Sequence, residues 1–228
     1  IQGMTMKATN EYWTSRQRQA HSLHEISYRG CYKPQLPKFF IERLTKKGDA
    51  VYDPFMGRGT TLLEAFLLGR KPLGNDINPL SQVILDTRFF PPSVEQIERR
   101  LNEIDLSKSK EEKPELLAFY HADTLKEITA LKEYFIQRET LGELDGIDKW
   151  IRMVAINRLS GHSPGFFSVY TLPPNQAVTI KRQLKINKNR NQVPEYKDIP
   201  SRILKKSKSL LKDWNESIPD EGLHDLSP

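Results

Sequence analysis

The sequence predicts an α/β fold in which parallel strands alternate with helices, and three stretches support this. A β-prone run at residues 50–52 leads through a glycine-rich turn into an apolar helix that ends near Gly69. A second strand is expected to follow and to end at Asp76, and residues 116–120 are expected to form a third. At 228 residues, the chain can form one α/β domain with an appended segment.

The remaining elements follow from apolar spacing and from helix start signals. We expect helices over residues 38–45, 78–85, 93–104, 125–138, 147–159 and 199–214. Ser93 and Gln96 form a capping box at the start of the third of these helices. Residues 166–171 are aromatic and β-prone.

Composition restricts the class of protein. Charged residues make up 28% of the chain and hydrophobic residues 37%, as is typical of a soluble globular protein. The single cysteine, Cys31, excludes an internal disulfide and a cysteine-rich zinc site. Because no apolar run reaches membrane length and no secretory signal is visible, we expect a cytoplasmic protein. Residues 1–3 precede Met4 and are interpreted as a tag remnant.

The turn after the first strand has the chemistry of a ligand site. Its sequence is Asp-Pro-Phe-Met-Gly-Arg-Gly-Thr-Thr, from Asp53 to Thr61. Gly57 and Gly59 let a ligand approach the backbone, and Thr60 or Thr61 can cap a helix whose first amides face that ligand. Asp53 would meet a cation, so the turn suits a zwitterionic amino-acid group better than a polyphosphate. The absence of Gly-Lys-Ser/Thr argues against a nucleotide-hydrolysing P-loop, and the spacing departs from that of dinucleotide binders.

This string resembles motif I of the DNA amino-methyltransferases, which methylate adenine-N6 or cytosine-N4. Their pattern, Asp-Pro-Phe-x-Gly-x-Gly-Thr-Thr, matches at every fixed position, and the resemblance covers about residues 20–125. It implies a Rossmann-like methyltransferase sandwich and S-adenosylmethionine as cofactor. It also implies that Asp53 holds the methionine ammonium group. The rest of the cofactor bed would be formed by Pro54, Phe55, Gly57, Gly59 and Thr60.

Further cofactor contacts are expected from three other segments. Asp76 lies about 20 residues beyond the glycine turn, where an acidic residue can accept hydrogen bonds from ribose hydroxyls, and Asp76 and Asn78 resemble motif II. The alternative is that Asp76 caps the next helix. His21 and Tyr28 loosely match motif X, whereas His21 and His24 make a poor metal site. Asp123 weakly matches motif III at the tip of the third strand, and a helix-capping role is the alternative.

The chain is expected to have three parts: an N-terminal arm at residues 1–20, a cofactor-binding core at 21–140, and a basic segment at 141–228. Residues 176–212 contain eleven Lys or Arg against two acidic residues, a net charge of +9, while the whole chain carries +6. This concentration favours a surface for duplex DNA over a merely solvated basic face. The expected contacts are Lys181, Arg182, Lys185, Lys188 and Arg190.

The second hallmark of the resembled enzymes, Asp/Asn/Ser-Pro-Pro-aromatic, is not found. It orients the amine of the extruded base, whose lone pair is delocalised into the ring. Phe90-Pro91-Pro92-Ser93 lacks the polar and aromatic members, and the chain's nearest catalytic candidate is Asn175 in Leu172-Pro173-Pro174-Asn175. We therefore expect a fragment that ends before this motif, or a motif supplied by another polypeptide. The expected function is exocyclic-amine methylation of DNA in restriction-modification. The alternatives are an RNA-base methyltransferase and a non-catalytic cofactor- or DNA-binding module.

Overall fold

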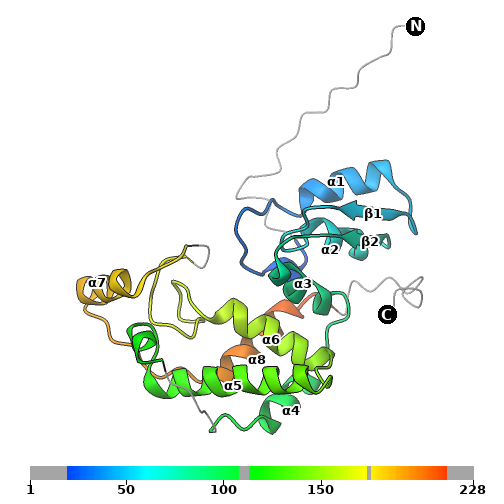
Figure 1. Ribbon diagram of the computed structural model, residues 1–228. Helices are drawn as coiled ribbons and strands as arrows, with labels where there is room; N and C mark the ends of the chain where they lie inside the picture. Colours follow the sequence, from blue (N-terminus) through cyan, green and yellow to red (C-terminus); the bar gives the residue numbers. More distant parts are fainter. Residues whose placement is uncertain (1–19, 108–112, 174–175, 215–228) are drawn as a thin grey trace, which may run out of the picture.

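The computed structural model describes residues 20–107, 113–173 and 176–214. Its elements fall into two groups, which Figure 1 shows one above the other. The upper group carries a small parallel sheet with helices packed on it, and the lower group consists of helices. No helix among the described residues is long and apolar enough to cross a membrane.

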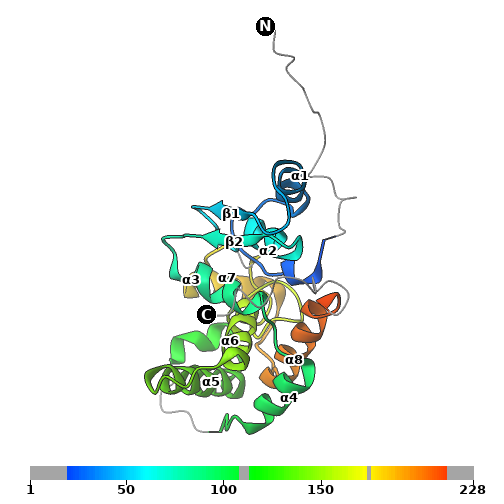
Figure 2. The same cartoon turned by 90° about the vertical axis from the view of Figure 1, so that its right-hand side faces the viewer.

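The sheet group follows the chain order expected from the sequence. The short helix η1 (Ser22–His24) and helix α1 (Gln35–Leu44) precede strand β1 (Ala50–Asp53), helix α2 (Thr60–Leu67), strand β2 (Lys71–Gly74), helix α3 (Pro79–Leu85) and the short helix η2 (Asp86–Arg88). Strands β1 and β2 pair in parallel, with Asp53 opposite Gly74. Both strands therefore end at the same edge, from which the glycine turn and Asp76 continue (Figure 2).

The helical group contains helices α4 (Val94–Glu103), α5 (Ala122–Thr140), α6 (Gly146–Arg158), α7 (Ile180–Arg190) and α8 (Ile199–Leu210). The capping box of Ser93 and Gln96 at the start of α4 is confirmed. Helix α6 places Trp150, Ile151 and Val154 in a hydrophobic core that also includes Leu23 and Ile84 of the sheet group. The core therefore joins the two groups. It also includes residues on both sides of position 140, where the sequence predicts a domain boundary.

The prediction of a third strand at residues 116–120 is wrong. Residues 114–118 form a short helix, η3 (Pro114–Ala118), and the two strands β1 and β2 are the whole sheet among the described residues. Long-range side-chain and loop partners explain the difference: Asn187 Nδ2 donates to the Ala118 carbonyl at 2.7 Å, and the Val169 amide donates to the Phe119 carbonyl at 2.8 Å. These donors take the place of a neighbouring strand. The β-prone residues 166–171 likewise form no strand, and residues 166–170 are bends.

Candidate functional site

Two carboxylates lie at the edge of the sheet where both strands end. Asp53 closes β1, and its carboxylate accepts hydrogen bonds from the Phe55 amide at 3.0 Å and from the Tyr32 hydroxyl at 3.3 Å. Phe55 is 86% exposed, so the turn presents an accessible apolar ring next to this carboxylate. Open parallel sheets bind ligands at this edge, and the sequence prediction for Asp53 and Phe55 is compatible with their positions.

Asp76 links the two loops that leave this edge. Its carboxylate accepts hydrogen bonds from the Gly57 amide at 2.7 Å and from the Asn78 amide at 2.8 Å. These two amides lower the pKa of Asp76, Asn78 first and Gly57 second, so the group is ionised at neutral pH. A carboxylate has about four acceptor positions, which leaves some for a ligand hydroxyl. The alternative of a helix cap is wrong, because the side chain that caps α3 is that of Asn78, which accepts from the Leu80 amide.

Gly59 is required at its position for two separate reasons. Its φ of 77° lies in the left-handed region, which disfavours a side chain. A Cβ atom there would also lie 2.4 Å from a methyl group of the buried Leu85. The N-cap residue of α2 is Gly59. The prediction that Thr60 or Thr61 caps this helix is therefore wrong. The Thr60 side chain is buried and accepts a hydrogen bond from Arg58 Nε at 3.0 Å.

Two arginines that were not expected to belong to the site, Arg58 and Arg88, hold the glycine turn from behind. Arg88 is fully buried and donates to the carbonyls of Leu23, Ile84 and Arg58. Burial, with the nearby Arg58 charge, lowers the pKa of Arg88 to about 9. Arg58 in turn donates to the carbonyls of His24 at 3.2 Å and Ile26 at 3.0 Å.

The two guanidinium groups add positive charge beside the N-terminus of α2. Neither forms an ion pair with a carboxylate in the part of the chain that the structure describes. A helix N-terminus and uncompensated cations both favour an anion. The carboxylate of Asp53 on the other side of the turn favours a cation. The site therefore suits a ligand that carries both charges.

Tyr28 and His21, the two residues expected from motif X, lie in different surroundings. The Tyr28 hydroxyl accepts from Asn78 Nδ2 at 3.2 Å, and its ring lies against Gly57. His21 instead lines a hollow with Glu64 and Leu67 of α2, and its Nδ1 accepts from the Leu23 amide at 3.2 Å. The structure therefore brings Tyr28 to the glycine turn and leaves His21 away from it. The described residues contain no cluster of metal-ligating side chains.

Asp123 does not lie at a strand tip, because the strand is absent. It is in the first turn of α5, its side chain is 63% exposed, and its amide donates to His121 Nδ1 at 3.2 Å. The side chain that caps this helix is therefore that of His121, and the alternative prediction that Asp123 caps it is wrong. Of the catalytic candidate segment, Leu172 and Pro173 are half-buried, whereas Pro174 and Asn175 lie outside the described residues.

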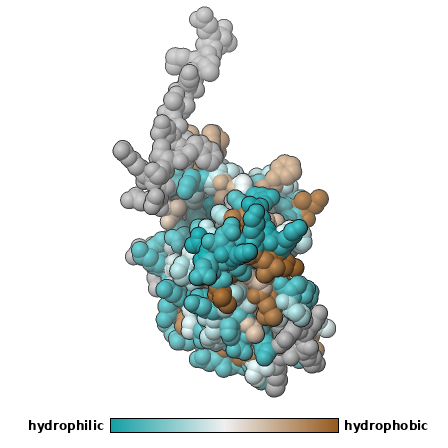
Figure 3. All heavy atoms as spheres, turned by 90° about the vertical axis from the view of Figure 1, so that its left-hand side faces the viewer, coloured by the Kyte–Doolittle hydropathy of each residue, from teal (hydrophilic) through white to brown (hydrophobic). Residues whose placement is uncertain are grey.

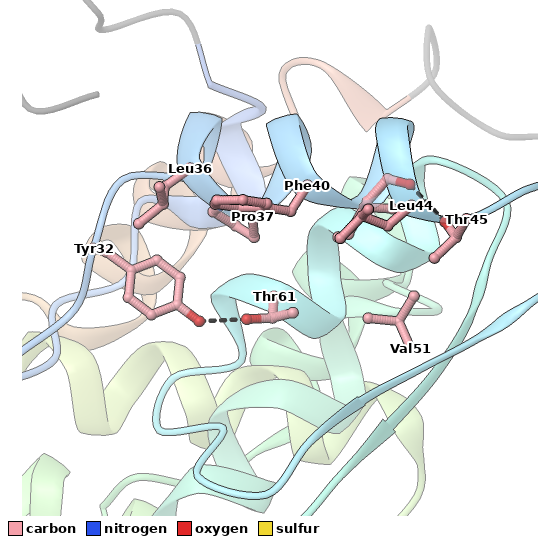
Figure 4. A pocket seen from close by; sticks show the side chains of 9 residues that line it. Tyr32, Leu36, Pro37, Phe40, Leu44, Thr45, Val51 and Thr61 are labelled. Carbon is pink, nitrogen blue, oxygen red and sulfur yellow. Dashed lines mark hydrogen bonds between the residues drawn. The ribbon is translucent and has the colours of Figure 1, made fainter. Parts of the chain in front are cut away.

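An apolar pocket of about 360 Å³ lies between α1, β1 and α2 of the sheet group (Figure 4). Leu36, Pro37, Phe40 and Leu44 point into it from α1, and Val51 faces them from β1. The Tyr32 hydroxyl hydrogen bonds with Thr61 at one end of this pocket and also donates to Asp53. The pocket therefore adjoins the glycine turn, and its lining offers few polar groups.

The five basic residues expected to contact DNA all lie on α7. Lys181, Lys185 and Lys188 follow the i, i+4, i+7 spacing of one helix face. All five side chains are exposed, and none pairs with a carboxylate of the described residues. Arg190 stacks over the Tyr170 ring at 3.8 Å. Helix α7 projects at the left of Figure 1, and Figure 3 shows that this side of the molecule is largely hydrophilic.

Part of the chain is similar to a known protein family. The DNA methylase family profile of N6 and N4 enzymes matches residues 4–83, the segment that contains the strand edge and the glycine turn. The resemblance stated from the sequence is confirmed over these residues, which are similar to the DNA methylase family. Enzymes of this family use S-adenosylmethionine to methylate exocyclic amines of DNA bases.

Individual relatives are similar to shorter or longer parts of the chain. The chain is 33% identical to the Type II methyltransferase M.MjaII of Methanocaldococcus jannaschii over 96 residues. These residues make up 42% of this chain and 18% of that protein. It is 31% identical over 122 residues to M.MvaI of Kocuria varians, or 52% of this chain and 23% of that protein. A tRNA (guanine(10)-N2)-dimethyltransferase of Methanocaldococcus jannaschii is 40% identical over 57 residues, 25% of this chain and 16% of that protein. The chain thus spans less than a quarter of each relative, and no solved structure matches it.

Proposed function

We propose that this chain is the S-adenosylmethionine-binding part of a DNA methyltransferase that acts on an exocyclic amine, adenine-N6 or cytosine-N4, within restriction-modification. The observation that carries the proposal is the strand edge, where Asp53, the glycine turn and Asp76 meet inside the segment that matches the family. A Rossmann-like sandwich is the complete fold that we propose around this edge, since a parallel sheet is normally covered on both faces and extended beyond two strands.

Each residue of the edge has a proposed role. Asp53 holds the ammonium group of the methionine moiety. The carboxylate of the same moiety is attracted by the amides at the start of α2 and by Arg58 and Arg88 behind them. Asp76 accepts from the ribose hydroxyls, and Phe55 covers the ligand. The bound cofactor supplies an electrophilic methyl group on a sulfonium. The chain's own contribution is to bind and align this group.

Calorimetry with S-adenosylmethionine and S-adenosylhomocysteine tests the cofactor site. We expect both ligands to bind, and Asp53→Ala to abolish binding because the ammonium group loses its counter-charge. The matched control is Glu98→Ala, which removes the same charge from an exposed position of α4. Folded protein that gives no heat with either ligand would contradict the proposal, as would an Asp53→Ala variant that binds like the control.

Transfer of the methyl group requires the amine-orienting motif, which we propose is carried by a further segment or another polypeptide. The 228-residue chain alone is therefore expected to show little methyl transfer to mixed genomic DNA. A normal enzymatic rate with labelled cofactor would refute this, and Asn175→Ala would then be the first variant to assay.

Duplex DNA is the proposed partner of α7. Each phosphate contact contributes roughly −0.9 to the slope of log affinity against log salt, so four or five contacts give a slope of about −4. Reversing the charges of Lys181, Arg182 and Lys185 should flatten the slope and leave cofactor binding unchanged. The control reverses the exposed Arg99, Lys132 and Lys149 of α4, α5 and α6, which lie outside residues 176–212. Equal slopes for the two triple variants, measured by fluorescence anisotropy, would mean that α7 is not the DNA surface.

An RNA base is the second candidate substrate, because one of the relatives is named a tRNA dimethyltransferase. Competition between duplex DNA and structured RNA of equal length, in the same anisotropy assay, separates the two. DNA is favoured because the DNA methyltransferases match over a longer part of the chain.

A further inference from the structure

Helix α7 is attached to the rest of the chain by polar side chains. Gln183, the buried residue of this helix, donates through Nε2 to the Tyr170 carbonyl at 3.0 Å and to Asn187 Oδ1 at 2.7 Å. Asn187 Nδ2 donates in turn to the Ala118 carbonyl at 2.7 Å. Just beyond the helix, Gln192 Nε2 donates to the same Tyr170 carbonyl at 2.8 Å. These hydrogen bonds connect distant parts of the chain and hold α7 in one orientation.

Two apolar side chains of α7 are exposed. Ile180 is 39% exposed and Leu184 is 55% exposed, and their i, i+4 spacing places them next to each other on the helix surface. A surface helix normally buries its apolar side chains and leaves the polar ones in solvent. Helix α7 has the reverse arrangement, because the side chain that it buries is that of Gln183. This reversal indicates that the apolar pair contacts a binding partner.

The charge of α7 defines the class of that partner. Lys188 continues the row of Ile180 and Leu184 by a further i, i+4 step, and Lys181 and Lys185 form a parallel row beside it. The helix contains no acidic residue, so its exposed surface favours a polyanion. Duplex DNA combines both properties that this surface requires, because its major groove presents the methyl group of thymine between two rows of phosphates.

The shape and position of α7 are compatible with this groove. An α-helix of 11 residues is about 16 Å long, and the major groove of duplex DNA is wide enough to admit an α-helix. Helix α7 lies at the left edge of the molecule in Figure 1, away from strands β1 and β2. With the row of Ile180 and Leu184 facing the bases, the neighbouring Lys181 and Lys185 would lie toward the phosphates of one strand.

We propose that α7 enters the major groove of duplex DNA and that Leu184 contacts the 5-methyl group of thymine there. This inference rests on the proposed function, in which duplex DNA is the partner of α7. Leu184 then determines specificity, whereas the lysines supply affinity that is independent of sequence. RNA lacks the thymine methyl group, and its narrow major groove does not admit side chains. The same contact therefore favours DNA over RNA.

The first test removes the methyl group from the DNA. A short duplex of alternating adenine and thymine offers a thymine in every register, and its uracil counterpart has the same base pairing and phosphates. Wild-type protein should bind the uracil duplex about fourfold more weakly, as expected for one methyl group that is no longer buried. Leu184→Ala should bind the two duplexes equally, and Leu184→Met, which keeps an apolar side chain of similar length, should retain the difference.

Two matched variants control for other effects. Leu141→Ala removes a leucine that is 60% exposed at the end of α5, and this variant should behave like wild type on both duplexes. Lys185→Ala should weaken binding to both duplexes by the same factor and reduce the salt slope by about 0.9, as expected for one phosphate contact. Fluorescence anisotropy at several salt concentrations measures both quantities. Because Leu184 is exposed, Leu184→Ala should unfold at the same temperature as wild type.

The outcomes separate this inference from the proposed function. Wild-type protein that binds both duplexes equally, or a Leu184→Ala variant that keeps the wild-type difference, overturns the contact with thymine. A salt slope that Lys185→Ala still reduces would then leave DNA standing as the partner of α7, and the apolar pair would belong to a protein interface instead. Wild-type protein that binds neither duplex contradicts the DNA-binding role of α7 together with this contact, while S-adenosylhomocysteine binding tests the cofactor site independently.

Discussion

Gly59→Ala should be among the most damaging single-methyl additions in the sheet group. The left-handed backbone at this position costs a side chain about 1–2 kcal/mol. The new Cβ would also lie 2.4, 2.8 and 2.9 Å from three atoms of Leu85, which is 2% exposed and cannot move into solvent. Overpacking of this kind adds about 1–3 kcal/mol. The expected loss of unfolding free energy is therefore about 2–5 kcal/mol.

Gly142→Ala is the matched control. Gly142 has a φ of 69°, and a Cβ added there would meet no atom within 4 Å. This variant should lose only the backbone term, about 1–2 kcal/mol, so the difference between the two variants measures the contact with Leu85. Urea unfolding followed by circular dichroism gives both values. S-adenosylhomocysteine binding should weaken in Gly59→Ala alone, because Gly142 lies at the end of α5, outside the glycine turn.

A double variant tests the proposed cause directly. Leu85→Ala alone should cost about 2–5 kcal/mol through the cavity that it leaves. In the Gly59→Ala background it should cost less, because the cavity accommodates the new methyl group. Equal losses in Gly59→Ala and Gly142→Ala, or strictly additive losses in the double variant, would show that the packing argument is wrong.

Two further predictions concern buried titratable side chains, His24 and Asp148. Burial lowers the pKa of His24, so the folded protein favours its neutral form. The stability that follows is complete above pH 6.5, the ordinary pKa, and is lost as the pH falls toward the lower pKa of the folded state. In urea unfolding between pH 7 and 5, His24→Gln should therefore make the free energy of unfolding depend less on pH. Asp148 is fully buried and accepts from Tyr134 at 2.9 Å and Arg138 at 3.0 Å, so Asp148→Asn should cost about 3–5 kcal/mol. Glu139→Gln, which breaks an ion pair whose carboxylate is 61% exposed, should cost less than about 1 kcal/mol, and equal losses would contradict the assigned difference in burial.

The sequence by itself determined the strand, glycine turn and helix on which the proposed site is built. Local rules were sufficient there: the β-prone run at residues 50–52, the glycines, and the Asn78-Pro79 start of α3 each act within a few residues of the chain. The five basic residues of α7 were also predictable, because charge can be counted without a fold. That they form a helix was not predicted.

Only the tertiary structure decided the parts that depend on distant partners. Residues 116–120 have strand-like composition, yet Asn187 and Val169 satisfy the carbonyls of Ala118 and Phe119 and no strand forms. The sequence does not reveal that Arg88 is buried, since its three acceptors come from segments up to 65 positions away. Hydrogen bonds and packing between remote residues fix these features, and no local pattern encodes them.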